Sequence, residues 1–318
     1  MRKLVVTEKM VGVRLDKMLS DKFPKRSRSE WKKIIDIGKV KIDGRIAKSH
    51  HKVNLDEVVE WQPMTKKQVF AAKQKPVSEQ AAINAKIKMK IVAENEDYLV
   101  INKPAGLLVH DAVWPPRRPT VAEAIIKKYP EVLSVGENPT RPGIVHRLDK
   151  DVSGLMVIPR SQAMFKTLKR QFQYRTVKKY YTALVYGTMS KAEGVIDFNL
   201  ARSSDGRKMA ARPVNQEGKK AITEYKVIRE WQNYTLLKVI IKTGRTHQIR
   251  AHFGALGHAL VGDDWYGTNK NKLKNKELAL GRVFLMASEL SFLDLEKKRQ
   301  TFSAKLPKQL NDLLKIIK

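Results

Sequence analysis

A polar, basic stretch at residues 62–90 divides this chain into two regions with different patterns. Lysine, glutamine and proline recur through it, and no sustained apolar face runs along it. A segment of this composition buries too little apolar surface to offset the conformational entropy lost on ordering. We therefore expect a linker at 62–90, flexible until it is bound, between a small unit at 1–61 and a larger one at 91–318.

The small unit has the pattern of two helices followed by short strands. Leu15, Met18 and Leu19 have helical spacing, and a second helix is expected to begin at Ser27 or Ser29 and to end at Gly38. Asp43-Gly44 is a strong signal for a tight hairpin turn. We expect it to join strands at 39–42 and 45–48, ahead of a closing strand through Val58, Val59 and Trp61.

The larger unit mixes short apolar runs with helical patches. The runs are typical of strands, at 98–102, 155–159, 182–185, 225–228 and 235–241, and the helical patches lie at 120–129, 162–172, 247–256 and 307–317. Strands outnumber the helices that could serve as crossovers. We therefore predict an α+β fold with a large mixed or antiparallel sheet and flanking helices.

Charge is the strongest compositional signal. The 318 residues include 63 lysines and arginines against 32 acids, a formal net charge of +31. Such an excess repels itself unless a polyanion neutralises it, which favours nucleic acid as the partner. A membrane surface is the alternative, but neither a basic amphipathic helix nor a lipidation signal is evident.

The absence of cysteine removes disulfides, thiolate metal sites and cysteine nucleophiles together. It also fits a reducing compartment. No run reaches the roughly 18 apolar residues of a membrane span, and the first residues do not resemble a signal peptide. We expect a cytoplasmic protein, a monomer with no membrane contact.

Three motifs carry candidate chemistry. Cations and hydroxyls cluster before the second helix, where they can contact several phosphates, although a solvated basic face has the same composition. Asp149 lies between Arg147 and Lys150, just before a buried strand. Nearby cations favour the ionised carboxylate that a nucleophile or base needs, yet an acid beside an arginine is more often a structural ion pair. The third motif is Thr243-Gly244-Arg245-Thr246-His247-Gln248-Ile249-Arg250, which suggests an anion-lined site.

Metal binding and nucleotide hydrolysis are disfavoured. His247 and His252 are five residues apart, an awkward spacing for one metal ion on a helix face. No glycine-rich phosphate-binding loop is present. We therefore expect no metal site and no nucleotide hydrolysis.

Two resemblances connect these motifs. Arg14-Leu15-Asp16-Lys17, Ser27-Arg28-Ser29 and the run from Ile35 to Gly44 follow the order of the alpha-L (S-four type) RNA-binding motif over residues 12–61. Asn102–His110, His146-Arg147-Leu148-Asp149, Lys179–Ala183 and Thr243–Arg250 occur in the order seen in pseudouridine synthases of the ribosomal-large-subunit type. The second resemblance covers residues 91–318.

The resemblance implies an isomerase that converts uridine to pseudouridine in RNA without a cofactor, most often in large-subunit ribosomal RNA. By family, Asp149, Tyr181 and Arg250 are catalytic: Asp149 reacts, Tyr181 stacks on the target base and Arg250 pairs with Asp149. Arg147 fills the space of the flipped base, and Leu285 lines the pocket. The front domain implies RNA-binding roles for a basic group of residues, namely Arg14, Arg26, Ser27, Arg28, Lys32 and Lys33.

Two positions depart from the family pattern. Val152 stands where threonine is usual, and Met286 replaces a frequent histidine. Three alternatives stay open: a ribosome-assembly factor that binds RNA without catalysis, an RNA hydrolase, and a synthase that acts on transfer RNA. Whether Asp149 forms a covalent adduct or promotes a glycal intermediate also stays open.

Overall fold

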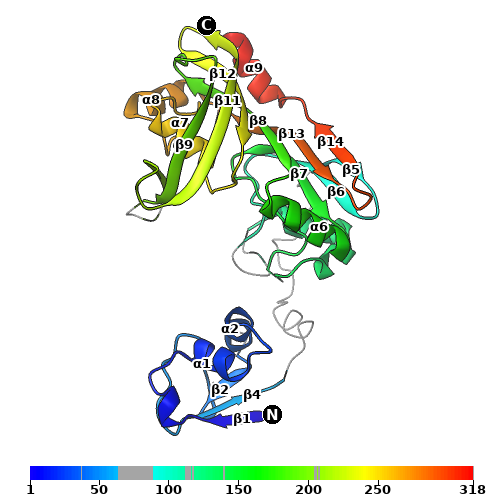
Figure 1. Ribbon diagram of the computed structural model, residues 1–318, viewed down its shortest axis with the longest axis vertical. Helices are drawn as coiled ribbons and strands as arrows, with labels where there is room; N and C mark the ends of the chain where they lie inside the picture. The colour runs from blue at the N-terminus through cyan, green and yellow to red at the C-terminus, as the bar shows by residue number, and fades with distance from the viewer. Residues whose placement is uncertain are drawn as a thin grey trace. The chain divides into compact units, whose positions relative to one another are not determined.

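The computed structural model describes residues 1–36, 38–63, 89–111, 116, 118–138, 140–203, 206 and 208–317. The chain divides into two compact units, Met1–Ser78 and Glu79–Lys318 (Figure 1). Residues 64–88 of the predicted linker lie outside the described residues. None of the described helices combines the length and apolar composition that crossing a bilayer requires.

The N-terminal unit packs two helices on a small sheet. Helices α1 (Leu15–Lys22) and α2 (Arg28–Asp36) accompany four strands in the order β1 (Arg2–Val5), β4 (Val58–Trp61), β2 (Val40–Ile42) and β3 (Arg45–Ile46). Asp43 and Gly44 both have left-handed backbones, with φ of 49° and 78°, as a two-residue hairpin turn requires. The predicted hairpin is therefore confirmed. In the core, Trp31 meets Trp61 edge to face, with ring centroids 5.7 Å apart.

The second unit is built on one ten-stranded sheet. Its strands are β5 (Lys90–Glu94), β6 (Tyr98–Lys103), β7 (Ser153–Pro159), β8 (Lys178–Tyr186), β9 (Glu193–Arg202), β10 (Met209–Arg212), β11 (Lys219–Trp231), β12 (Tyr234–Ile241), β13 (Leu285–Leu293) and β14 (Arg299–Ser303). The order is β10-β9-β11-β12-β8-β13-β7-β6-β5, and β14 pairs with β13. The pairing of β13 with β7 is parallel, whereas the other pairs in this sheet are antiparallel. The predicted mixed sheet is confirmed.

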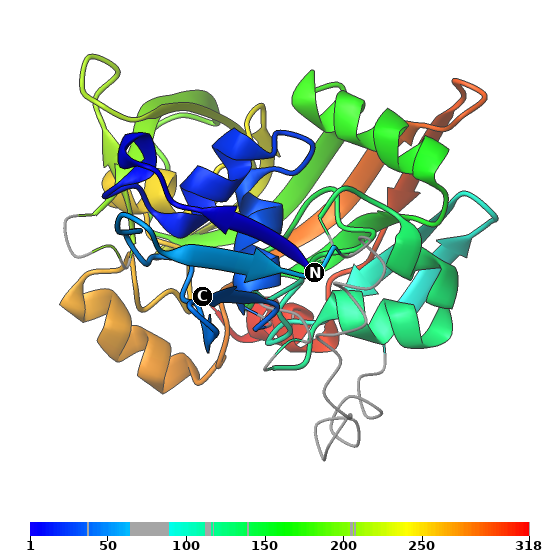
Figure 2. The same cartoon turned by 90° about the horizontal axis from the view of Figure 1, so that it is seen from below.

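Helices cover both faces of this sheet. Successive side chains of a strand point to opposite faces, and Leu99 and Ile101 share a core with α5 (Val121–Lys128) and α7 (Gln248–Ala255). Tyr98 and Val100, which alternate with Leu99 and Ile101 along β6, pack against α6 (Gln162–Gln173) on the other face. In Figure 2 the green α6 and the teal α5 lie on opposite sides of the strands. Helix α9 (Lys308–Ile316) packs on β8 and β13, while α8 (Asn269–Leu278) has a single buried residue, Asn275.

The centre of the sheet positions the candidate site. Strands β7, β13 and β8 are neighbours there, and Tyr181 of β8 lies opposite Ala287 of β13. Gly154, in β7, allows the close approach of β13: a Cβ at this position would lie 2.3 Å from the carbonyl oxygen of Ala287. The loop that carries Asp149 leads directly into β7 and is fixed by this packing.

Candidate active site

The loop that carries Asp149 is anchored by a buried lysine. The Lys103 ammonium, fully buried, donates to the backbone carbonyls of Pro104 (2.9 Å), Leu107 (2.8 Å) and Lys150 (3.0 Å). Burial lowers the pKa of Lys103 to about 7, and the charge of Arg282 acts in the same direction. Because Lys150 follows Asp149, these bonds fix the loop beside the carboxylate.

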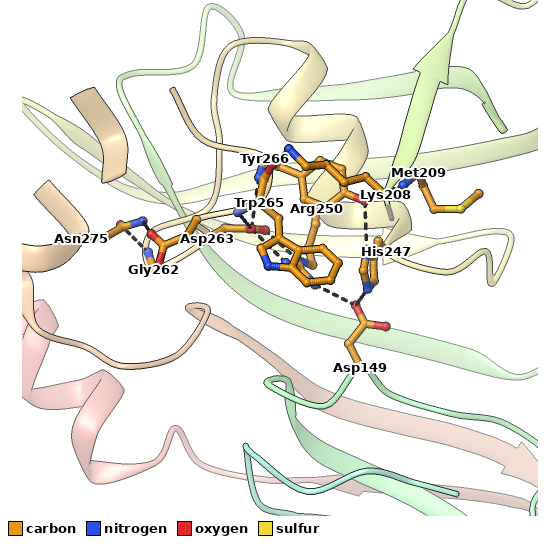
Figure 3. Close-up of polar contacts among 11 residues, drawn as sticks. Asp149, Lys208, Met209, His247, Arg250, Gly262, Asp263, Trp265, Tyr266 and Asn275 are labelled. Atoms are coloured by element: carbon orange, nitrogen blue, oxygen red, sulfur yellow. Dashed lines mark hydrogen bonds and ion pairs between the residues drawn. The ribbon is translucent and has the colours of Figure 1, made fainter. Parts of the chain in front are cut away.

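Arg250, in α7, lies between two carboxylates (Figure 3). Its Nε and Nη2 donate to the two oxygens of Asp263 at 2.7 and 2.9 Å, and its Nη1 lies 3.7 Å from Oδ2 of Asp149. Burial alone would lower the pKa of Arg250, but its hydrogen bond to Asp263 and the charges of Asp263 and Asp149 raise it. The guanidinium is therefore a fixed positive charge beside Asp149.

Asp263 is held in turn by its own loop. Its Oδ1 accepts hydrogen bonds from the backbone N–H groups of Trp265 (3.0 Å) and Tyr266 (3.3 Å). Trp265 and Tyr266 also place their rings 5.7 and 5.2 Å from the Arg250 guanidinium. Arg250 is therefore constrained by charge, hydrogen bonds and aromatic packing together.

His247 comes directly before α7 and also faces Asp149. Its Nε2 lies 3.9 Å from Oδ2 of Asp149, and its Nδ1 lies 3.0 Å from the hydroxyl of Tyr266. The backbone of His247 is left-handed, with φ of 52°. Burial lowers the pKa of His247; the charges of Arg250 and Arg147 also lower it, whereas those of Asp149 and Asp263 raise it.

Tyr181 and Leu285 contribute buried side chains from adjacent strands. Tyr181 is 5% exposed and Leu285 is 3% exposed, and both belong to the core beneath the sheet centre. Burial raises the pKa of the Tyr181 hydroxyl, and the negative charge of Asp149 raises it further. Tyr181 is therefore a neutral phenol at ordinary pH.

Arg147, in contrast, is exposed. Within the described part of the chain its guanidinium has no hydrogen bond or ion pair. A cation that is near Asp149 in the sequence and has no protein partner is available to a polyanion.

The two departures from the family pattern are both buried. Val152 is 2% exposed and packs in the main core, where a methyl group suits the surroundings. Met286 is fully buried in β13 and packs with the α9 cluster.

The whole chain matches known proteins. A family model described as RNA pseudouridylate synthase matches residues 97–255, which include Asp149, Tyr181 and Arg250, and a model of the S4 domain matches residues 13–59. An uncharacterized RNA pseudouridine synthase of Aquifex aeolicus is 38% identical over 84% of this chain and 81% of its own length. The chain belongs to the RNA pseudouridine synthase family.

Other relatives of this synthase carry more specific names. The ribosomal large subunit pseudouridine synthase D of Zymomonas mobilis is 33% identical over 99% of this chain and 96% of its own length. The protein of the same name from Haemophilus influenzae is 36% identical over 85% of this chain and 78% of its own length. The synthase is thus an isomerase with an S4 domain in front.

Solved structures support the fold. Human RNA pseudouridylate synthase domain containing 1 matches with a TM-score of 0.56 and 24% identity, over 74% of this chain and 87% of that chain. Human RNA pseudouridylate synthase domain containing 4 matches with a TM-score of 0.57 and 23% identity, over 74% of this chain and 96% of that chain. Because the identities are low, these matches speak for the fold alone.

The S4 unit of the synthase presents an organised basic group. Arg14 and Arg28 both contact the buried carboxylate of Asp16, at 3.0 and 3.2 Å, while their own side chains stay 43% and 49% exposed. Desolvation by burial would raise the pKa of Asp16, but its hydrogen bonds to the two arginines and their charges lower it. Two of the three predicted RNA-binding arginines, Arg14 and Arg28, are thus held in place by one acid.

The start of α2 accounts for the remaining predicted RNA-binding residues. Ser27 and Glu30 form a reciprocal capping box: the Ser27 N–H donates to Oε2 of Glu30 at 2.8 Å, and the Glu30 N–H donates to Oγ of Ser27 at 3.3 Å. Arg26 lies over the Trp31 ring, 5.9 Å from its centroid, and Lys32 is exposed. The side chain of Lys33 lies outside the described part.

Several site residues were not predicted from the sequence. Asp263, Tyr266 and Lys103 were not singled out for roles in the site, and His247 was considered as part of an anion-lined motif and as a metal ligand but not as a neighbour of Asp149. Among the described residues, no group of three or more histidine, aspartate or glutamate side chains is arranged to hold a metal ion. The signal for Lys103 lies in the run Asn102-Lys103-Pro104, where a lysine ends the buried strand β6.

Proposed function

We propose that this synthase converts specific uridines of large-subunit ribosomal RNA to pseudouridine, with Asp149 as the reacting group. One observation carries the proposal: the Asp149 carboxylate has Arg250 at 3.7 Å, and Arg250 is itself fixed by Asp263. A carboxylate beside a fixed positive charge on an anchored loop suits nucleophilic attack or proton abstraction. The names of two relatives, which match 99% and 85% of this chain, support ribosomal RNA as the substrate.

The target base must leave the RNA stack before Asp149 can reach it. Extruding a base costs a few kcal/mol. Arg147 is exposed and without a protein partner in the described residues, so it can enter the vacated space and meet phosphates. Asp149 then promotes cleavage of the bond between ribose and N1, and the ring, once turned, rejoins through carbon 5 with loss of its hydrogen.

Tyr181 and Leu285 form the buried side of the proposed base site. The raised pKa of Tyr181 disfavours its phenolate, which supports stacking on the uracil over proton abstraction as its role. Leu285 is buried in β13, whose neighbour in the sheet is β8 with Tyr181, and offers apolar contact.

We propose that residues 1–61 dock the RNA, that residues 62–90 connect them to the rest, and that residues 91–318 carry the chemistry. The basic group around α2 supports docking, because Arg14 and Arg28 are organised by Asp16 and remain half-exposed. We also propose that the protein is a cytoplasmic monomer; the cysteine-free sequence fits a reducing compartment, and light scattering on the purified protein tests the monomer.

Replacing Asp149 tests the assignment. RNA carrying tritium at carbon 5 of uridine releases the label when the base rejoins through that carbon. Wild-type protein should release tritium from large-subunit ribosomal RNA, and Asp149→Ala and Asp149→Asn should release none while binding RNA within severalfold. Wild-type release from transfer RNA alone would reassign the substrate, and release by Asp149→Ala at the normal rate would refute the role of Asp149.

A further inference from the structure

The two oxygens of Asp149 have different surroundings. The shortest contacts of Arg250 Nη1 (3.7 Å) and His247 Nε2 (3.9 Å) are both to Oδ2. Within the described part of the chain neither oxygen accepts a hydrogen bond, so these two longer contacts to Oδ2 are what distinguishes the oxygens. In Figure 3 the dashed lines from Arg250 and His247 converge on one oxygen, and the other oxygen points away.

A relay of hydrogen bonds fixes which nitrogen of His247 carries the proton. The Tyr266 hydroxyl accepts the backbone N–H of Met209 at 2.9 Å and lies 3.0 Å from Nδ1 of His247. The phenol has one hydrogen to donate, and among the described residues its available acceptor is Nδ1. Nδ1 therefore accepts, and the neutral imidazole carries its hydrogen on Nε2, the nitrogen that faces Asp149.

The protonation states agree with this relay. Burial lowers the pKa of His247, so the ring is neutral near pH 7 and its tautomer matters; Asp149 and Asp263 oppose that shift, and Arg250 and Arg147 reinforce it. Burial also raises the pKa of Tyr266, so the phenol keeps its hydrogen.

The backbone conformation of His247 also holds its ring in the orientation that faces Asp149. His247 has a left-handed conformation that a residue with a side chain rarely adopts, and such conformations persist where the surroundings enforce them. The next residue supplies the constraint: Oε1 of Gln248 accepts from the Thr243 hydroxyl at 2.6 Å and from the Arg245 N–H at 3.1 Å. The Trp265 ring flanks the imidazole, with centroids 5.5 Å apart.

We propose that His247 is a positioning residue for Asp149: with Arg250 it directs an N–H at Oδ2, so that Oδ1 is the oxygen that reacts with the substrate. At 3.9 Å the His247 N–H acts through its dipole, and a small rotation of the carboxylate brings it to hydrogen-bond distance in the substrate complex. This inference rests on the proposed role of Asp149.

Amide replacements of His247 give a discriminating test. The side-chain nitrogen of glutamine can take the place of Nε2, whereas that of asparagine reaches only the place of Nδ1. His247→Gln should retain most of kcat, whereas His247→Asn and His247→Ala should lose roughly 10- to 100-fold, the scale of a misplaced reacting group. KM for RNA should stay within about threefold in all three variants. His258→Gln is the matched control, because Nδ1 of His258 contacts the Tyr186 carbonyl at 3.0 Å outside this site, and its kcat should be unchanged.

Nitrogen-15 NMR of labelled histidine gives a readout that does not depend on activity. The wild-type His247 signal, assigned by its loss in His247→Gln, should show hydrogen on Nε2. Tyr266→Phe, which removes the donor to Nδ1, should shift the ring toward a mixture of tautomers. Hydrogen on Nδ1 in the wild type, or equal kcat for the glutamine and asparagine variants, would overturn the inference. An active Asp149→Ala would instead refute the proposed function, and the tautomer result would still stand.

Discussion

Arg250 contacts Asp263 more closely than it contacts Asp149. Two hydrogen bonds of 2.7 and 2.9 Å join it to Asp263, whose side chain is fully buried, whereas Asp149 lies 3.7 Å away and is 18% exposed. The arginine is thus anchored by one acid and acts on another. Anchoring lets it hold one geometry whether or not RNA is bound.

Asp263→Asn should therefore damage both stability and activity. Removing one member of a buried ion pair leaves the other charge uncompensated, at a cost of about 3–5 kcal/mol. Urea unfolding should show this loss, and kcat should fall because Arg250 is no longer fixed. Asp312→Asn is the control: Asp312 is 48% exposed beside Lys315, and losing its surface pair should change stability by less than about 1 kcal/mol. Equal stabilities for the two variants would contradict the anchoring role.

Stability should fall in mild acid because of His146. Burial lowers the pKa of this imidazole from 6.5 to about 3, with the charge of Lys179 acting in the same direction, and its Nε2 accepts the Val157 N–H at 3.0 Å. Between pH 6.5 and about 3, the unfolded chain binds a proton on His146 that the folded chain does not bind. Stability that is present above pH 6.5 is therefore lost as the pH falls toward 3. The loss is at most about 1.4 kcal/mol per pH unit.

Urea unfolding of the wild type and His146→Gln at several pH values measures this effect. Protonation of the acids affects both proteins alike, so the difference between them isolates His146. The amount by which the free energy of unfolding of the wild type exceeds that of His146→Gln should shrink as pH is lowered from 7 to 5. A difference that stays constant over this range would show that His146 is not the source.

Neutralising the basic group of the S4 unit should weaken RNA binding and its salt dependence. Arg26→Gln with Lys32→Gln leaves the Arg14–Asp16–Arg28 cluster intact. The slope of log affinity against log salt should fall by roughly 1 for each phosphate contact removed. Fluorescence anisotropy at four salt concentrations measures it, and Lys41→Gln on β2, also exposed, is the comparison. An unchanged slope would leave this group with a role in solubility only.

Gly154→Ala should disrupt the sheet beside the Asp149 loop. Its Cβ would lie 2.5 Å from the Ala287 nitrogen and 2.3 Å from the Ala287 oxygen. Backbone atoms in a sheet cannot move away without breaking the hydrogen bonds of the strand pairing. We expect a loss of roughly 3 kcal/mol or more. Gly257→Ala has a similarly left-handed backbone, with φ of 82°, but open space around it, so it should cost only about 1 kcal/mol of strain. Comparable thermal stabilities would refute the close approach.

Local patterns predicted the elements with strong periodicity or turn chemistry. The strand expected at 98–102 is observed as β6, and the helix expected at 162–172 is observed as α6. Helix α8 was missed because its sequence, Asn269–Leu278, has almost no apolar stripe; it begins at a capping box between Thr268 and Asn271. Strand β13 was also missed, because its polar residues interrupt the apolar run in Leu285–Leu293.

The candidate site was predictable only where it coincides with motifs. Resemblance placed Asp149, Tyr181 and Arg250 together, and the structure brings them to the centre of one sheet. The resemblance could not show that Asp263, and not the adjacent Asp264, points at Arg250, because the two acids are chemically alike. Lys103 was hidden for a different reason: lysine is normally exposed, and its burial depends on nearby carbonyls together with that of Lys150, 47 residues away.

The parallel pairing of β7 with β13 sets the order in which the protein can assemble. Ser153 pairs with Met286, so almost half of the chain separates two residues that must meet beside the Asp149 loop. Contacts this distant form late in folding, and a ribosome delivers the chain from its N-terminus. The S4 unit can therefore fold, and capture RNA, while the enzyme is still being translated. Isomerase activity must wait until nearly the last strand has emerged.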